Sequence, residues 1–198
     1  GTLKGKVALP YQVPYGTIVP RRCDNLLVPV AVSASRVGYA TLRQAPTWTA
    51  LGQAAGAAAV EALEAGCPPR EVDVERVQHR LHAAGAKTFY ASDVEPDSPC
   101  FEAVQFLGNR GFFQHLYPPG EKVRWGERLS SQHFEAFAKH DVGVDEPLTP
   151  ELAREWAELA REVFGPEVKA PLEESLGDQA RRRSRGELID ELYRSARQ

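Results

Sequence analysis

The stretch that decides the fold is Asn25-Leu-Leu-Val-Pro-Val-Ala-Val-Ser-Ala-Ser-Arg-Val-Gly-Tyr-Ala-Thr-Leu-Arg-Gln-Ala-Pro-Thr-Trp-Thr-Ala-Leu-Gly-Gln-Ala-Ala-Gly56. Its apolar run, 26–32, is typical of a strand buried on both faces, and Pro29 places it at a strand end or an edge. Residues 33–44 predict a long irregular connection. Pro46 suits the first turn of a helix, which we expect to continue to residue 65 and to end at Gly66.

Small residues recur on one stripe of this predicted helix, at Gly52, Ala55, Gly56 and Ala59. Another backbone or a ligand can approach closely along such a stripe. A glycine inside a helix costs about 1 kcal/mol relative to alanine, so the two glycines suggest that close packing offsets this loss. Glu61 and Glu64 exclude a membrane-spanning helix.

Composition sets limits on the class of protein. The 198 residues suffice for one large or two small domains, and a net charge of −3 favours neither nucleic acid nor membrane surfaces as partners. The three cysteines are widely spaced and form no Cys-x-x-Cys pair, so we expect no metal site. The chain starts Gly-Thr without Met, which indicates a fragment or a processed chain. We expect a soluble protein, cytoplasmic or exported, without a membrane span.

Six motifs, in chain order, resemble the C-terminal stretch of one family, the bacterial FAD-dependent oxidoreductases of the glutathione-reductase-like superfamily, in its xanthan-lyase-like branch. They are Pro14-Tyr15, Asn25-Leu-Leu-Val-Pro-Val30, Ser33-Ala-Ser35, Leu42-Arg43, Pro46-Thr47 and Leu51-Gly-Gln-Ala-Ala-Gly56. The resemblance covers roughly residues 10–86 and implies FAD as the cofactor. It also implies that 26–32 is the last strand of a Rossmann-type FAD domain, and that the following helix directs its N-terminus at the flavin.

The resemblance assigns site residues by position. Those near the FAD pyrophosphate and ribitol are Val30, Ala31 and Ser33, and those near the flavin are Arg43, Gln44, Ala45 and Thr47. A reduced flavin ring carries negative charge near N1 and the C2 carbonyl, which a helix N-terminus and a fixed positive charge favour. Many relatives have Gly-Arg where this chain has Val30-Ala31, and often have His where it has Arg36. Because Arg cannot act as a base near neutral pH, a proton-transfer role of that His would be changed or lost here.

An essential part of such a cofactor site is missing. FAD binding in these folds depends on a strand, a Gly-x-Gly-x-x-Gly turn and a helix that hold the pyrophosphate, and this sequence contains no such motif. One strand and one helix also cannot cover both faces of a parallel sheet. We therefore expect a partner chain or a missing segment that carries the Gly-x-Gly-x-x-Gly half, and hence a hetero-oligomer if the half is a separate chain.

The rest of the chain predicts helices. Asp73 is expected to cap a helix that ends at Gly85, and residues 87–96 form a linker, so the predicted domains are 1–86 and 87–198. Further helices are expected to open at Ser98-Pro99, at Ser130 or Ser131, at Thr149-Pro150-Glu151 and at the capping box Ser184-x-x-Glu187. Short motifs after residue 91, such as Ser92-Asp-Val-Glu-Pro-Asp97, are also weakly similar to surface-layer-homology modules.

The sequence therefore predicts an α/β fragment, the last strand and helix of a Rossmann-type FAD domain, followed by a mainly α-helical C-terminal module. Its predicted function is that of the C-terminal half, or completing subunit, of an FAD-dependent oxidoreductase that acts on a small molecule and is not active as this chain alone. Arg36 and Arg43 are the expected catalytic residues, and Tyr15 and Tyr39 are candidates for the substrate wall. The alternatives are a non-catalytic cell-surface anchoring module and a structural subunit of a larger redox complex.

Overall fold

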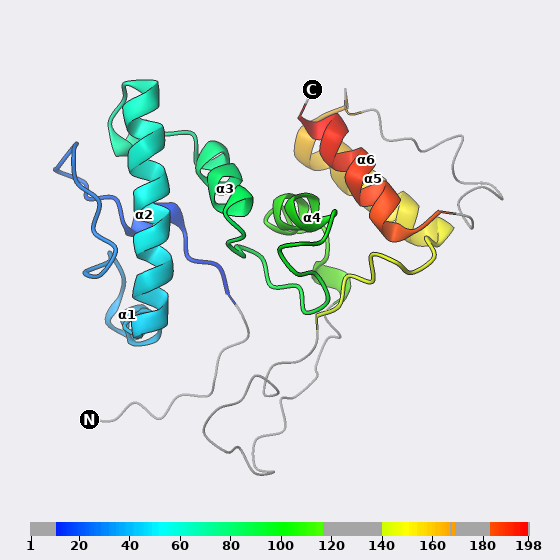
Figure 1. Cartoon of the computed structure of the whole chain (residues 1–198), viewed down its shortest axis with the longest axis horizontal. Coiled ribbons are helices and arrows are strands. Elements are labelled where there is room, and N and C mark those ends of the chain that lie inside the picture. Colours follow the sequence, from blue (N-terminus) through cyan, green and yellow to red (C-terminus); the bar gives the residue numbers. More distant parts are fainter. Residues whose placement is uncertain (1–10, 117–139, 167, 169–182, 198) are drawn as a thin grey trace, which may run out of the picture. The chain divides into compact units, whose positions relative to one another are not determined.

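The computed structural model describes residues 11–116, 140–166, 168 and 183–197. It divides into two compact units, Gly1–Ala86 and Lys87–Gln198. Residues 87–96, which were predicted to be a linker, belong to the second unit, and Phe89, Ala91 and Val94 are buried in its core. The first unit contains the helices α1, α2 and α3, and the second contains α4, α5 and α6 (Figure 1). Because the two units are not placed relative to each other, each is described by itself.

The long helix α2, Ala45–Ala65, confirms the main helix prediction. Pro46 lies in its first turn, where a residue without an N–H interrupts no helical hydrogen bond. Gly66 ends the helix in the left-handed conformation, at φ 63°, and its amide donates to the carbonyl oxygens of Ala62 and Leu63. Gly is favoured there because it has no Cβ to clash at positive φ.

The strand predicted at 26–32 is not formed. In the described part of the chain no residue belongs to a β-strand, and the single isolated bridge pairs Pro147 with Ser184 in the second unit. Val32 is buried, but Leu26 and Val30 are both 47% exposed, so the segment is not covered on both faces. The physical reason is that a strand requires a regular ladder of hydrogen bonds to a second strand, and the described residues supply no second strand.

The irregular connection predicted at 33–44 contains a helix instead, α1, Arg36–Leu42. The side chain of Ser35 caps it by accepting a hydrogen bond from the amide of Gly38, at 3.1 Å. Leu42 anchors its last turn in a small core. The sequence conceals this helix because Val37, Gly38 and Thr41 all have low helix propensity, so the cap and one buried leucine decide its formation.

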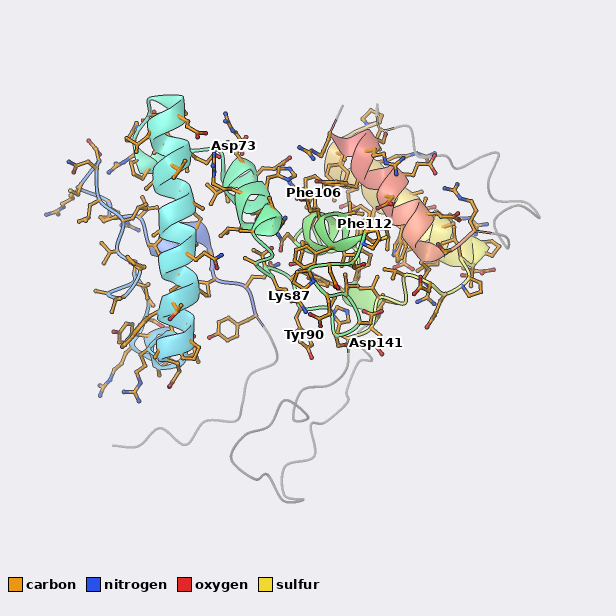
Figure 2. The ribbon with its side chains drawn as sticks, viewed as in Figure 1. Asp73, Lys87, Tyr90, Phe106, Phe112 and Asp141 are labelled. Atoms are coloured by element: carbon orange, nitrogen blue, oxygen red, sulfur yellow. The ribbon has the colours of Figure 1, made fainter. Side chains whose placement is uncertain are left out.

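The packing of α2 organises the first unit. Its buried side contributes Leu51 and Ala55 to one small core and Ala58 and Ala62 to another. The other members of the first core are Ile18, Val32 and Leu42; those of the second are Val72, Val77 and Leu81. Helix α3, Val74–Ala83, packs beside α2, and Asp73 caps it through a 2.9 Å hydrogen bond from the Glu75 amide, as predicted (Figure 2).

A buried carboxylate joins α2 to α3. Glu61 is 5% exposed and lies between two guanidinium groups, 3.0 Å from Nε of Arg76 and 2.7 Å from Nη2 of Arg80. Arg80 also reaches Glu64 on α2, at 2.8 Å. A carboxylate is retained inside a protein only when opposite charge and hydrogen bonds compensate for its lost hydration, and here both arginines come from α3.

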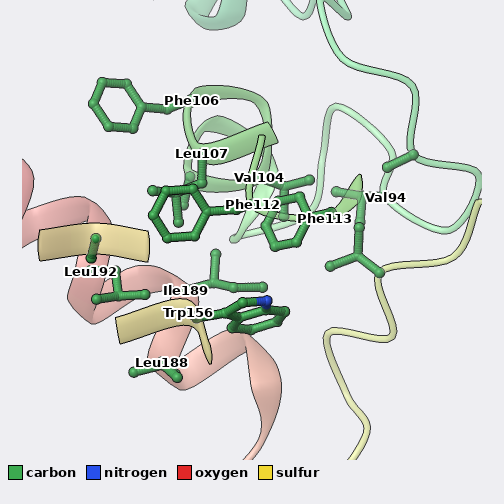
Figure 3. Packing of buried hydrophobic residues seen from close by; sticks show 14 of the residues in the cluster. Val94, Val104, Phe106, Leu107, Phe112, Phe113, Trp156, Leu188, Ile189 and Leu192 are labelled. Atoms are coloured by element: carbon green, nitrogen blue, oxygen red, sulfur yellow. The ribbon is translucent and has the colours of Figure 1, made fainter. Parts of the chain in front are cut away.

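The second unit has one continuous core. It brings together α4, Phe101–Gly108, α5, Pro150–Phe164, and α6, Arg185–Ala196, around Trp156 (Figure 3). The Thr149 cap of α5 and the capping box between Ser184 and Glu187 are as predicted. Helix α4 begins at Phe101, after Cys100, slightly later than expected. The helix predicted to open at Ser130 or Ser131 lies outside the described residues.

Two buried polar side chains tie the loops of this unit to its core. Gln105 on α4 accepts hydrogen bonds from the amides of Thr88 and Phe89, at 2.7 and 2.8 Å. The ring of His140 is fully buried, and its Nδ1 lies 2.8 Å from the carbonyl oxygen of Tyr90. Because buried polar groups must be paired, these contacts determine the paths of both loops.

The Glu61 cluster gives a stability prediction. Glu61→Ala leaves Arg76 and Arg80 without their shared buried partner, so we expect the free energy of unfolding to fall by about 1–3 kcal/mol. Glu64→Ala is the matched control, because Glu64 is half exposed and an exposed ion pair contributes about 0–1 kcal/mol. Urea unfolding followed by circular dichroism measures both. Equal losses for the two variants would contradict the role given to Glu61.

Candidate functional site

The N-terminus of α2 is open to an external acceptor. Gln44 is its N-cap residue but forms no side-chain capping hydrogen bond. The first helical hydrogen bond is donated by the amide of Trp48 to the carbonyl of Gln44, at 3.1 Å. The preceding amides, those of Ala45 and Thr47, therefore have no partner within the helix, and Pro46 has no N–H. Two aligned N–H groups at the positive end of the helix dipole favour a negative group.

Side-chain charge near this helix end has one sign only. Between residues 25 and 60 the sequence contains Arg36 and Arg43 and no Asp or Glu. Arg36 is the first residue of α1 and Arg43 is its C-cap residue, directly before the N-cap of α2. Both are exposed, and neither forms an ion pair with any residue that the structure describes. Positive charge without a protein counter-ion adds to the field of the helix end and attracts an anion.

Residues adjacent in sequence to the predicted site residues meet in one small core. Val32, from the 30–33 segment, packs in one cluster with Leu42 at the end of α1 and Leu51 in α2. The assigned residues lie around this cluster at the surface: Val30, Ala31, Ser33, Arg36, Arg43, Gln44 and Ala45 are exposed, and Thr47 is partly exposed. The short helix α1 adjoins the N-terminal end of α2 (Figure 1). Arg36 and Arg43 thus add exposed positive charge at the two ends of α1, before the N-terminus of α2.

Main-chain hydrogen bonds hold the 28–33 segment in place. The amide of Val28 donates to the carbonyl oxygen of Ile18 at 2.8 Å, and the amide of Ser33 donates to that of Thr17 at 2.7 Å. Val30 and Ala31 lie between these two bonds. Because Ile18 is 1% exposed, the segment is attached to the core on one side while its central residues stay accessible.

The two tyrosines proposed for a substrate wall are placed differently. The hydroxyl of Tyr15 donates to the carbonyl oxygen of Pro69, at 2.7 Å, and burial, together with the nearby Cys67, raises the pKa of Tyr15 above its ordinary value. Its proton is thus retained for this structural bond. Tyr39 packs partly buried against the core formed by Val32, Leu42 and Leu51. Both side chains pack, partly buried, against the small core that contains Val32 and Leu42, a role that sequence reasoning did not assign to them.

The outer face of α2 lacks a covering layer within the described residues. We define this face as the side of α2 formed by Thr49, Gly52, Gly56, Val60 and Leu63. Val60 and Leu63 are 39% and 83% exposed, and a Cβ added at Gly52 or Gly56 would meet no atom within 4 Å. The close packing predicted for these glycines is therefore not made in the described part of the first unit. A helix that is apolar on both sides is normally buried on both sides.

Comparison with models of known protein families gives a match to the first unit. Residues 2–81 fit the family model of the FAD dependent oxidoreductases. This range contains α1, α2 and the 28–33 segment, so the match supports an FAD oxidoreductase as the class of this part of the chain. The match covers less than half of the chain. Neither the curated proteins nor the solved structures contain a match to it.

In the described ranges, no three His, Cys, Asp or Glu side chains are arranged to hold a metal ion. None of the helices there has the length and apolar character needed to cross a bilayer.

The open outer face gives a second prediction. Gly52→Ala and Gly56→Ala each remove a helix-interior glycine, and the added methyl group points into free space. We expect each variant of the chain alone to be stabilised by up to about 1 kcal/mol, measured as the free energy of urea unfolding. A loss of stability instead would mean that another part of the chain packs against these glycines.

Proposed function

We propose that this chain is the C-terminal half, or a completing subunit, of an FAD-dependent oxidoreductase of the glutathione-reductase-like type. Its α2 N-terminus, Arg36 and Arg43 face the anionic parts of FAD, and Val30, Ala31 and Ser33 approach the pyrophosphate and ribitol. A second polypeptide segment supplies the Gly-x-Gly-x-x-Gly turn and the sheet to which 26–32 adds as the last strand. The observation that carries the proposal is the uncapped, positively charged end of α2 inside the family match.

The donor set fits such a cofactor. FAD presents phosphate oxygens and a ring system whose reduced form is negatively charged, and the stretch 25–60 offers amide donors and two guanidinium groups and contains no carboxylate. When bound, FAD supplies the electron transfer to and from the substrate. The residues of this chain bind and orient it. Arg43 supplies fixed charge beside the flavin, and Arg36 cannot serve as a base there.

The outer face of α2 supports the proposal that a further segment completes the domain. Covering Val60 and Leu63 removes apolar surface from water, and burial of one such side chain is worth about 1.5–3 kcal/mol. Gly52 and Gly56 allow a neighbouring element to approach the α2 backbone directly. The same segment would give residues 26–32 a neighbouring strand.

Assembly is tested by expressing the chain with an affinity tag in its native host. We expect it to purify with FAD and with a segment or chain that carries Gly-x-Gly-x-x-Gly. Gly56→Leu fills the open space on the outer face, so overpacking of about 1–3 kcal/mol should weaken the association about tenfold or more. Ala50→Leu, an exposed position elsewhere on α2, is the matched control. Tight FAD binding by the monomeric chain alone would refute the completing role.

Arg43 is tested on the bound flavin itself. Arg43→Ala removes a positive charge that favours the reduced, negatively charged ring, so we expect a lower midpoint potential. The fall is about 30 mV for each 1.4 kcal/mol of lost stabilisation in a two-electron couple, and spectroelectrochemistry measures it. Arg43→Lys should keep most of the potential, and Arg154→Ala, an exposed arginine on α5, is the control for net charge. A flavin spectrum and potential unaffected by Arg43→Ala would instead favour a structural subunit.

A further inference from the structure

One arginine of the first unit, Arg70, binds several oxygen atoms of the loop formed by residues 20–24. Arg70 belongs to the short 3₁₀ helix η2, Pro69–Glu71, close to the C-terminal end of α2. Its Nη1 donates to the carbonyl oxygen of Arg21 at 3.3 Å, and its Nη2 donates to those of Pro20 and Cys23 at 3.3 and 3.2 Å. Nη2 also lies 2.7 Å from the carboxylate of Asp24.

Four oxygen atoms of residues 20–24 thus converge on one guanidinium group. An exposed Arg–Asp pair by itself contributes little to stability, but here three main-chain carbonyls point the same way. Aligned carbonyl dipoles repel one another unless a donor lies between them. A guanidinium group has five N–H donors in a rigid plane, so it can serve several acceptors at once, whereas a lysine ammonium is a single compact charge.

This loop leads directly into the segment that carries the assigned cofactor contacts. The amide of Ser33 donates a hydrogen bond to the carbonyl oxygen of Thr17, and the amide of Val28 donates to that of Ile18. Residues 19–27 form the loop that connects Ile18 to Val28. Arg70 binds residues 20–24 within that loop. Tyr15 attaches the start of the same region to η2 through its hydrogen bond to Pro69. The position of 28–33 therefore depends on η2, which is distant from it in sequence.

We propose that Arg70 is a positioning residue for the cofactor-facing segment 28–33. Its guanidinium binds the four oxygen atoms of residues 20–24, which we call the oxygen cage. It thereby sets the path by which Val30, Ala31 and Ser33 reach the surface. The role toward FAD rests on the proposed function. The effect on the 28–33 segment does not, so it can be tested on the chain alone.

The first experiment measures amide hydrogen exchange by NMR in the full chain. Arg70→Ala empties the cage, so the amides of Val28 and Ser33 should exchange about tenfold faster or more, while the amides of α2 keep their protection. Arg70→Lys should restore little of this protection. Arg22→Ala, an exposed arginine on the same loop, changes the net charge equally and should leave both amides unchanged.

Chemical rescue makes the test specific for the cage. Methylguanidinium at millimolar concentration, far below denaturing levels, should restore protection at Val28 and Ser33 in Arg70→Ala, while methylammonium of the same charge should not. Unchanged exchange in Arg70→Ala overturns the proposal. So does equal rescue by both cations, because it would show that only charge is required.

The second experiment measures the FAD dissociation constant of the assembled protein by flavin fluorescence. We expect Arg70→Ala to weaken FAD binding about tenfold, with recovery by methylguanidinium. If exchange changes but FAD affinity does not, the positioning role toward the cofactor is wrong. If the wild-type assembly binds no FAD, the proposed function fails while the effect of Arg70 on segment 28–33 stands.

Discussion

The first unit depends on the packing of α2, a helix that is apolar on both sides but covered on one. Its buried side joins two small cores, one with residues from 18–42 and one with Val72 and residues of α3. The Glu61 carboxylate, held by Arg76 and Arg80, determines where α3 lies against it. A helix that is apolar on both sides is normally buried on both sides, and no described residue covers the outer face of α2.

The same helix explains why the candidate site lies where it does. Its N-terminus carries partly unsatisfied amides, and the covalent connection to α1 places Arg43 directly before it. The absence of acidic residues between 25 and 60 means that nothing nearby in sequence neutralises these charges. The helix dipole and the side-chain charge therefore both favour a negative group at this end of α2. This end lies inside the match to the FAD dependent oxidoreductases at residues 2–81.

Local signals predicted the helices well where cap residues and glycine stops occur. Pro46 and Gly66 delimit α2, Asp73 opens α3, and Thr149 and Ser184 open α5 and α6. The same reasoning missed α1, because its sequence has poor helix propensity and its cap is a serine that suits a turn equally well. It also predicted a strand at 26–32 from apolar content alone, although a strand needs a partner that apolar content does not provide.

The sequence by itself determined the chemical character of the candidate site: a stretch whose only charged side chains are two arginines, a helix with Pro at its start, and glycines inside it. These are properties of residue type and spacing along one chain. Only the tertiary structure decided which of these features are satisfied internally. It engaged the hydroxyl of Tyr15 in a hydrogen bond to Pro69, placed no described residue over Gly52 and Gly56, and joined Arg70 to a loop about fifty positions away. Such contacts depend on how the chain returns to itself, which no local pattern encodes.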